Sequence, residues 1–276
     1  MISLAAAPRA TAGEVVLVVS AHTGPFFEAA QAFEQTFHQE RTTDTLVMLE
    51  PGQPFNDANV VVVMDTKLAA SLIDIDVPLI HCMALHAPSG AAALVLAYSI
   101  EDQLQLVRKV VPRATRVGVV YSDDHSAQIV EQARSLVEGY GLKLIDVRIS
   151  GPAELSRALN GLANRVDILW GVPDLSLYTP ATSKAVLVIQ FRQRVPFIGL
   201  NDTWVQGGAA MGPSFDPVAL GGQCAQIAGE LLDGTPVSEI GIRKPQIMPY
   251  AINLHSLEEM NVAVTPSVID EARYVY

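Results

Sequence analysis

The feature that most constrains the fold is an order of apolar runs that occurs twice along the chain. In the first half the runs are VVLVVS (15–20), TLVMLE (45–50), NVVVVMD (59–65) and IDVPLIHC (75–82). The corresponding runs of the second half are VGVVY (117–121), LKLIDV (142–147), VDILWGVPD (166–174) and QRVPFIGL (193–200). Near-continuous apolar strands are typical of parallel sheets covered on both faces. The repeat therefore predicts an α/β protein with two similar lobes.

A helical pattern follows the first strand of each half. The segment 25–37 places apolar residues at helical spacing on one face: Phe26, Ala29, Ala30, Phe33 and Phe37. The second pattern has an apolar stripe of Ile129, Val130, Ala133, Leu136, Val137 and Tyr140. Ser126 is the N-cap that we predict for this second helix, and Gly141 is its predicted end.

The connecting segments predict that the chain crosses between the lobes more than once. A helix that begins at Pro217 and ends at Gly234-Thr235-Pro236 has no counterpart in the repeat, so we expect it to return to the first lobe. The predicted lobes are 14–97 with 214–245, and 98–213 with 246–270. The predicted hinge strands are Leu96–Ile100, Met211–Phe215 and Tyr250–Asn253. We interpret residues 1–13 as the remnant of a secretory signal or as a disordered N-terminus.

Charge and cysteine content exclude some classes of function. The chain has 276 residues and a formal net charge of −11, without a run of Lys or Arg, which disfavours nucleic acid as a partner. No apolar segment reaches the roughly 20 residues of a membrane helix. Cys82 and Cys224 are far apart and have no neighbours suited to zinc. We predict that both are small buried residues, in neither a disulfide nor a metal site.

The stretch Ser122-Asp123-Asp124-His125-Ser126 has three interpretations: a catalytic or metal cluster, a helix cap, and the rim of a binding cleft. The other histidines form no HxxxH pair, and the chain contains no GxSxG, GxGxxG or GxxxxGK[ST] motif. We therefore expect no catalysis, no cofactor and no metal. Capping by Asp124 or Ser126 stays open beside the cleft interpretation.

The order of several segments resembles a known family. They are RVGVVYSDDHSAQIVEQA, DILWGVPDLSL, the run from Val195 to Ile240, and INLHSLEEMNVAVTPSVI. These segments resemble the ABC-transporter substrate-binding proteins of the type I periplasmic binding-protein fold, whose relatives include amino-acid binders. The resemblance implies two Rossmann-like lobes joined by a multi-strand hinge. It also implies a small solute in the cleft, an ABC permease as membrane partner, a monomer, and a periplasmic or extracytoplasmic location.

A zwitterionic solute fits the polar loops that follow the strands, because ligands of such sheets bind beyond the carboxyl ends of the strands. The helix N-termini after Gly24 and after His125 are predicted to accept a carboxylate. Asp174 and Asp202 are predicted to accept hydrogen bonds from an ammonium group, although a turn or cap role stays open for each. The candidate ligand-binding residues are His22, Thr23, Gly24, Phe26, Phe27, Ser122, Asp124, His125, Ser126, Pro173, Asp174, Tyr178, Asn201, Asp202, Thr203, Trp204 and Phe215.

Several alternatives remain open at this point. Core packing competes with ligand contact for the aromatic candidates Phe26, Phe27, Tyr178 and Trp204. The acidic pair Asp123-Asp124 keeps a cationic or neutral solute as an alternative to a zwitterion. A ligand-sensing domain of a regulator or receptor on the same fold is the alternative function, and an anchor or an N-terminal DNA-binding domain would identify it. An enzyme acting in the cleft would be identified by turnover of the bound compound.

Overall fold

The computed structural model describes residues 13–20, 22–55, 58–64, 75–84 and 86–276. The chain divides into two compact units. The first unit comprises the chain up to Ala97 together with Asp216–Gln246, and the second comprises Tyr98–Phe215 together with Ile247–Tyr276. The chain therefore passes between the units three times. Nearly all of the predicted signal remnant, residues 1–12, lies outside the described residues.

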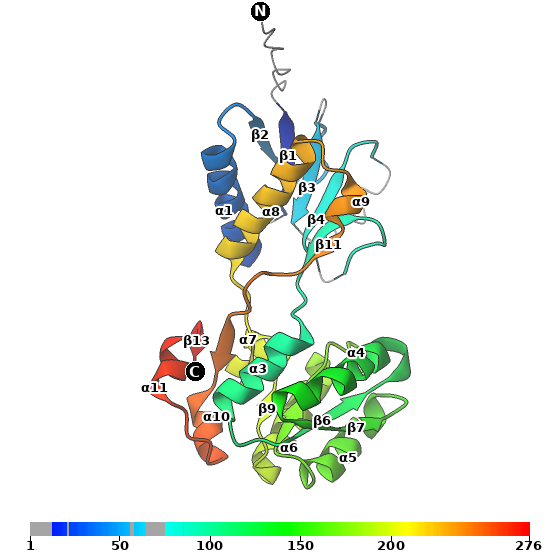
Figure 1. Ribbon diagram of the computed structural model, residues 1–276, viewed down its shortest axis with the longest axis vertical. Coiled ribbons are helices and arrows are strands. Elements are labelled where there is room, and N and C mark those ends of the chain that lie inside the picture. The colour runs from blue at the N-terminus through cyan, green and yellow to red at the C-terminus, as the bar shows by residue number, and fades with distance from the viewer. Residues whose placement is uncertain (1–12, 21, 56–57, 65–74, 85) are drawn as a thin grey trace, which may run out of the picture. The chain divides into compact units, whose positions relative to one another are not determined.

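The first unit is built on a six-stranded parallel sheet with the order β11-β5-β4-β3-β1-β2 (Figure 1). Its strands are β1 (Glu14–Val18), β2 (Thr45–Leu49), β3 (Val60–Met64), β4 (Leu79–Ala84), β5 (Ala92–Val95) and β11 (Ile242–Arg243). Its helices are α1 (Pro25–Glu40), α8 (Pro217–Leu232) and α9 (Val237–Ile240). Every residue of β3 and β5 is buried, as expected for inner strands of a parallel sheet covered on both faces.

The second unit contains a seven-stranded sheet with the order β13-β12-β10-β9-β8-β6-β7. Its strands are β6 (Arg116–Tyr121), β7 (Lys143–Arg148), β8 (Ile168–Trp170), β9 (Phe197–Ile198), β10 (Met211–Pro213), β12 (Tyr250–Ile252) and β13 (Tyr274–Val275). Its helices are α3 (Ile100–Val110), α4 (Asp123–Leu136), the 3-10 helix η1 (Val137–Tyr140), α5 (Pro152–Ala163), α6 (Pro180–Gln193), α7 (Asp202–Gln206), α10 (Leu254–Glu259) and α11 (Pro266–Asp270). The pairing is parallel throughout except between β10 and β12.

The two sheets confirm the predicted α/β fold with two mostly parallel sheets, although several elements are shorter or shifted. The run 193–200 contains only the two-residue strand β9, because α6 extends to Gln193 and a turn separates it from the strand. The predicted N-cap Ser126 is wrong. The helix begins one turn earlier, at Asp123, and Ser126 is a fully buried residue inside it. Gly141 ends the following 3-10 turn in the left-handed conformation, at φ 64°.

Helix α8 packs on α1 in the first unit, and one glycine makes the close contact possible. A Cβ atom added to Gly221 would lie 2.0 Å from the carbonyl oxygen of Ala29 in α1. No side chain fits there without separating the two helices, so glycine is required by the packing rather than by its backbone angles.

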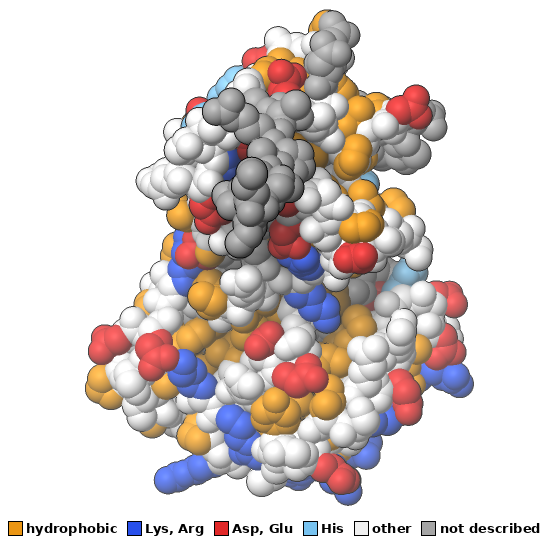
Figure 2. All heavy atoms as spheres, turned by 45° about the horizontal axis from the view of Figure 1, so that its top comes forward, with side chains coloured by type: hydrophobic (Ala, Val, Ile, Leu, Met, Phe, Trp, Pro, Cys, Tyr) orange, Lys and Arg blue, Asp and Glu red, His pale blue; other side chains and the backbone are white. Residues whose placement is uncertain are grey.

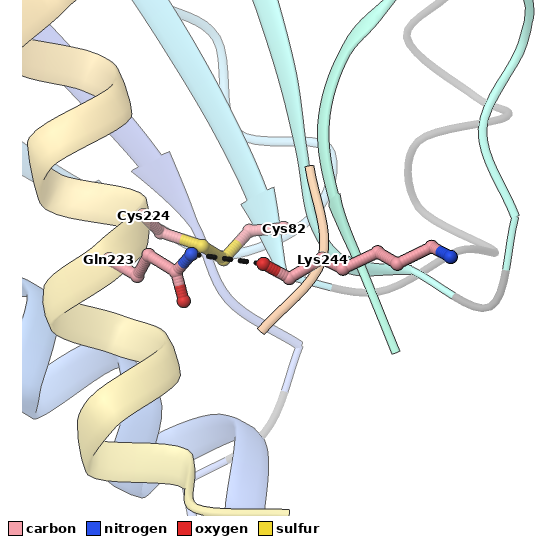
Figure 3. The surroundings of a disulfide bond; sticks show 4 residues. All are labelled: Cys82, Gln223, Cys224 and Lys244. Atoms are coloured by element: carbon pink, nitrogen blue, oxygen red, sulfur yellow. Dashed lines mark hydrogen bonds between the residues drawn. A yellow bond between two sulfur atoms is a disulfide. The ribbon is translucent and has the colours of Figure 1, made fainter. Parts of the chain in front are cut away.

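Cys82 and Cys224 form a disulfide, which corrects the prediction of two separate thiols. Their Cα atoms lie 6.2 Å apart, and the bond joins β4 to α8 within the first unit (Figure 3). Beside it, the Gln223 side chain donates to the carbonyl oxygen of Lys244 at 3.1 Å. The prediction failed because the parallel order of the sheet brings together residues that 142 positions separate.

The predicted hinge strands lie partly inside the second unit. Strands β10 and β12 pair with each other antiparallel, and the chain passes between units just outside them, after Phe215 and after Gln246. The prediction of a strand at Leu96–Ile100 is wrong, because this segment is a loop that leads into α3, where the N-cap Ser99 and Asp102 form a capping box. Among the helices that the structure describes, none has the length and apolar character needed to cross a membrane.

Candidate functional site

A buried carboxylate organises the carboxyl ends of β6 and β8 in the second unit. Asp174 is inaccessible to solvent. Its Oδ2 accepts hydrogen bonds from the Ser122 hydroxyl at 2.6 Å, the Ser126 hydroxyl at 2.6 Å and the Ser122 amide at 3.2 Å. Its Oδ1 accepts from the Ser176 hydroxyl at 2.6 Å and the Ser176 amide at 3.1 Å. Both oxygens are thus engaged within the second unit.

The hydrogen bonds keep Asp174 ionised. Burial alone would raise the pKa of its carboxyl, but the donors from Ser122, Ser126 and Ser176 hold that pKa below its ordinary value. A buried, ionised carboxylate with five donors is a rigid link between the loop before α4 and the loop after β8. Its role in the structure is to position these loops, and its burial argues against direct contact with a solute.

The start of α4 is polar and exposed beside this link. Ser122 occupies the N-cap position but makes no side-chain cap, because its hydroxyl is bonded to Asp174. Asp123, Asp124 and His125 are exposed in the first turn. Asp123 pairs with Arg148 at 3.0 Å. A pocket of about 400 Å3 lies between this turn, the carboxyl end of β7 and the first turn of α5. This turn therefore carries two acidic groups next to unpaired backbone N–H groups of the helix end.

A second polar turn follows β9. The Asn201 side chain caps α7 by accepting from the Trp204 amide at 3.2 Å. Asp202 is half-buried, accepts from the Thr203 amide at 2.9 Å, and accepts from the Ser214 hydroxyl at 3.3 Å. The exposed Thr203 completes the turn. Of the two aspartates predicted to bind an ammonium group, Asp174 is buried and Asp202 is partly exposed to solvent.

The aromatic candidates divide between core and surface. Tyr178 is buried in the core of the second unit, where its hydroxyl donates to the Val120 carbonyl at 3.0 Å and burial raises its pKa. Trp204 is half-buried and meets the Tyr178 ring edge-on, with the centroids 6.3 Å apart. Phe215 stacks on Tyr98 with centroids 5.0 Å apart. Pro173 is exposed in the loop that carries Asp174.

The first unit presents its own polar group at the carboxyl end of β1. Gly24 takes a φ of 80° and precedes α1, which begins at Pro25 without a side-chain cap. His22 and Thr23 are exposed, and His22 Nε2 lies 3.1 Å from Glu50 Oε1. Phe26 and Phe27 are both half-buried in the first turn of α1. The ring centroid of Phe27 lies 6.5 Å from that of His22.

The structure thus gathers the candidates into two groups, one at the end of each unit's sheet. In the second unit, Ser122, Ser126 and Asp174 bond directly to one another. Sequence reasoning missed Ser176, which the local pattern Asp174-Leu175-Ser176 indicates, because an aspartate commonly accepts from the amide two residues later. It also missed Tyr98 and Ser214, which are joined by a hydrogen bond from the Tyr98 hydroxyl to the Ser214 carbonyl. No local signal points to that pair.

Charge is mixed on the face of the molecule that Figure 2 shows. Lys and Arg side chains are scattered there among Asp and Glu rather than gathered in one patch. Among the described residues, several basic side chains pair with acidic ones, for example Arg243 with Glu230 at 2.6 Å and Arg134 with Asp146 at 2.7 Å.

The fold and the polar strand ends define a two-unit α/β binding protein, and comparison with known proteins gives the family. A family model described as ABC transporter substrate binding protein matches residues 93–276. The chain therefore belongs to the ABC transporter substrate-binding protein family. This is a family of binding proteins, in agreement with the prediction that the chain is not an enzyme.

Individual relatives are more distant. A tyrosine-binding protein of Clostridioides difficile (strain R20291) is 25% identical over 182 residues, which are 65% of this chain and 52% of that protein. The match thus spans about half the length of this curated relative.

Solved structures share the fold at low identity. A ligand-free, open substrate-binding protein with adhesive properties from Clostridium difficile has a TM-score of 0.72 at 15% identity, covering 96% of this chain and 99% of that one. An ABC domain from Streptococcus pneumonia in complex with L-Trp has a TM-score of 0.61 at 15% identity, covering 96% of this chain and 100% of that one. At this identity, these likenesses show the fold alone.

Proposed function

We propose that the protein is the solute-receiving component of an ABC importer, and that it binds a small amino-acid-like solute with contacts from both units. The observation that carries the proposal is the polar rim formed by the loops after β6 and β8, which the buried Asp174 holds together, with the polar turn after β9. A braced rim holds its exposed groups in fixed positions, which lowers the entropy lost when a solute is bound. The partners are a small solute and the membrane permease of the transporter.

The charges of the two strand ends suit the two ends of an amino acid. Helix α1 begins without a side-chain cap, so its free N–H groups and helix dipole suit a carboxylate. In the second unit, Asp202 is a half-buried carboxylate that suits an ammonium group. Helix α4 also lacks a side-chain cap, but its first turn carries two acidic residues, Asp123 and Asp124, whereas that of α1 carries one, Glu28, so an anion is opposed more strongly at α4. We therefore assign the solute carboxylate to α1 and the ammonium group to Asp202.

The names of two relatives support this solute class. The curated relative is called a tyrosine-binding protein, and one structure of the same fold holds L-Trp. Both solutes are amino acids. The relatives are distant, so their names support an amino acid in general and leave the particular one to experiment.

An extracytoplasmic location is part of the proposal, and the disulfide supports it. Disulfides persist in the periplasm and other oxidising compartments and are rare in the reducing cytosol. The bond between Cys82 and Cys224 is buried within the first unit, so it serves as a structural bond there. The family's role in transport requires the same location, because the protein presents its solute to a permease at the outer face of the membrane.

The test is a thermal-shift screen of the purified protein against amino acids, small peptides, polyamines and nucleosides. A solute at a hundredfold excess over Kd stabilises the native protein by about 2.7 kcal/mol. We expect a shift with amino acids, and at least tenfold weaker binding by Asp202→Asn, which keeps the turn but loses the charge. The exposed Asp270→Asn serves as the matched control. A shift with nucleosides or polyamines instead, or with no compound, would overturn the amino-acid proposal.

A further inference from the structure

Basic side chains gather along one edge of the sheet in the second unit. Strands β9, β8, β6 and β7 are adjacent in that order and run parallel, so their amino ends lie along the same edge. The connections that lead into these strands are residues 111–116, 137–143, 164–167 and 192–196. Their basic residues, which we call the basic edge, are Arg113, Arg116, Lys143, Arg165, Arg192 and Arg194.

Carboxylates neutralise only a small part of this charge. The acidic residues of the same connections are Glu138 and Asp167, and Asp167 pairs with Arg116 at 2.6 Å. Within the part of the chain that the structure describes, no ion pair engages the other members of the basic edge, and all of them are exposed. An acidic chain of net charge −11 therefore presents a net positive charge to solvent along this edge.

A further arginine fixes the backbone of the basic edge. The Arg108 guanidinium donates to the carbonyl oxygens of Pro112 and Ala114 in one connection at 3.0 and 2.8 Å. It also donates to those of Tyr140 and Gly141 in the next connection, both at 2.6 Å. These four hydrogen bonds hold the two connections side by side, so the backbone positions of the cations that they carry are fixed.

An exposed aromatic ring lies beside the cations. Phe191 belongs to the last turn of α6, directly precedes Arg192 and is 38% exposed. A Cβ atom added to Gly208 would lie 3.5 Å from the Phe191 ring. Gly208 is in the connection that leads into β10, the next strand of the sheet. The ring therefore continues the basic edge beyond β9 with an apolar group.

We infer that the basic edge and Phe191 bind the surface of a membrane that contains anionic lipids. Lys and Arg side chains are attracted to anionic headgroups, and an aromatic ring suits the boundary between headgroups and acyl chains. At physiological ionic strength the Debye length is about 8 Å, so a lipid surface responds to the nearest charges rather than to the net charge of the chain. With about 4.8 Å between neighbouring strands, the four amino ends span about 14 Å, and their cations face one surface together.

This contact is separate from solute binding. The polar rim of the proposed function follows the carboxyl ends of β6, β8 and β9, whereas the basic edge precedes the amino ends of the same strands. Because these are opposite edges of one sheet, lipid bound at the basic edge leaves the polar rim open. The interaction would keep the protein at the membrane between encounters with its permease.

The experiment is co-sedimentation of the untagged full chain with vesicles of phosphatidylcholine alone or mixed with phosphatidylglycerol. We expect binding to the mixed vesicles in 0.1 M NaCl, and at least tenfold weaker binding to the neutral ones. Raising NaCl to 0.5 M should also weaken binding to the mixed vesicles at least tenfold, because salt screens the attraction.

Two triple variants test the location of the contact. Arg165→Gln with Arg192→Gln and Arg194→Gln removes three cations of the basic edge and should weaken binding to the mixed vesicles at least tenfold. The matched control removes the same charge from exposed positions outside the edge and should change binding less than threefold; it combines Arg157→Gln, Lys184→Gln and Lys244→Gln. Phe191→Ala should weaken binding two- to fivefold and leave its dependence on salt unchanged. Thermal melting shows that each variant is folded.

Several outcomes would overturn the inference. They are equal binding to neutral and mixed vesicles, binding to neither, and equal losses in the two triple variants, which would assign the effect to net charge alone. Retention of the protein on heparin without binding to vesicles would assign the basic edge to a soluble polyanion instead. The solute-induced thermal shift should be the same in the edge variant and the wild type, so the proposed function stands or fails independently of this contact.

Discussion

Cys82 in β4 is bonded to Cys224 in α8, and the loop that this bond closes contains all of Tyr98–Phe215 in the second unit. The first unit is made of two separate parts of the chain, and the disulfide is the covalent link between them. A cross-link over a long loop restricts the unfolded chain strongly, which is one account of why such bonds stabilise. The stability of the first unit is therefore tied to the redox state of its surroundings.

Removal of the disulfide should destabilise the protein. We expect Cys82→Ala combined with Cys224→Ala to lower the free energy of unfolding by roughly 2–5 kcal/mol, measured by urea denaturation. A thiol reductant should lower the free energy of unfolding of the wild type toward that of the double variant. It should leave the free energy of unfolding of the double variant unchanged, which is the internal control. Mass spectrometry of the folded protein after alkylation should find no labelled cysteine. Two labelled cysteines in the native, unreduced protein would contradict the bond.

Asp174→Asn should be destabilising although it changes a single atom. In either orientation, the amide NH2 of the new side chain faces a backbone N–H, that of Ser122 on one side or that of Ser176 on the other. An unsatisfied buried donor costs about 1–3 kcal/mol, and we expect a loss of this size in urea denaturation at pH 7.

The exposed Asp270→Asn is the control for this substitution and should change stability by less than about 0.5 kcal/mol. Because the pKa of Asp174 is lowered in the folded state, its contribution is complete above the ordinary aspartate pKa of 3.8 and is lost as the pH falls through the lower folded value. Equal stability of Asp174→Asn and the wild type at pH 7 would show that the carboxylate does not brace the rim.

His81 should make the first unit less stable as the pH falls. Burial in β4 lowers the pKa of its imidazole below the ordinary value of 6.5. Between that value and the lower folded pKa, the unfolded state binds more protons than the folded state, so stability decreases as the pH decreases. We expect the urea midpoint of the wild type to fall between pH 7.5 and pH 5.5.

His81→Gln removes this titration, so its midpoint should change less over the same interval than that of the wild type. His255→Gln, at an exposed histidine, is the control and should behave as the wild type. The same pH dependence in His81→Gln and the wild type would assign the effect to other groups.

Gly221→Ala should separate α8 from α1. Its new Cβ would lie 2.0 Å from the backbone oxygen of Ala29, which has no room to move away alone. Overpacking of this kind typically costs about 1–3 kcal/mol, and we expect at least that loss in thermal or urea unfolding. The matched control is Gly161→Ala in α5, where a Cβ meets nothing within 4 Å and the higher helix propensity of alanine should stabilise by up to about 1 kcal/mol. Equal effects of the two substitutions would contradict the close contact.

Local patterns were sufficient to predict most elements of secondary structure. The first helix was expected over 25–37 and is observed as Pro25–Glu40, because its apolar face repeats at the period of a helix. The start of α8 at Pro217 was also predicted, since proline suits the first turn of a helix. Ser126 was misplaced as an N-cap because it lies inside α4, where its hydroxyl donates to Asp174, 48 residues away, and accepts from the amide of Ser122, the residue at the N-cap position.

The sequence by itself determined the α/β class and its repetition, because strand and helix periodicities are local properties of the side chains. Only the tertiary structure decided that Cys82 meets Cys224, that Asp174 is enclosed by Ser122, Ser126 and Ser176, and that Gly221 touches Ala29. These contacts join residues far apart in the chain, and they depend on the order of strands in the sheets and on the path of the chain between the units. Neither leaves a periodic signal in one sequence, so the residues that brace the site emerge only when the chain is folded.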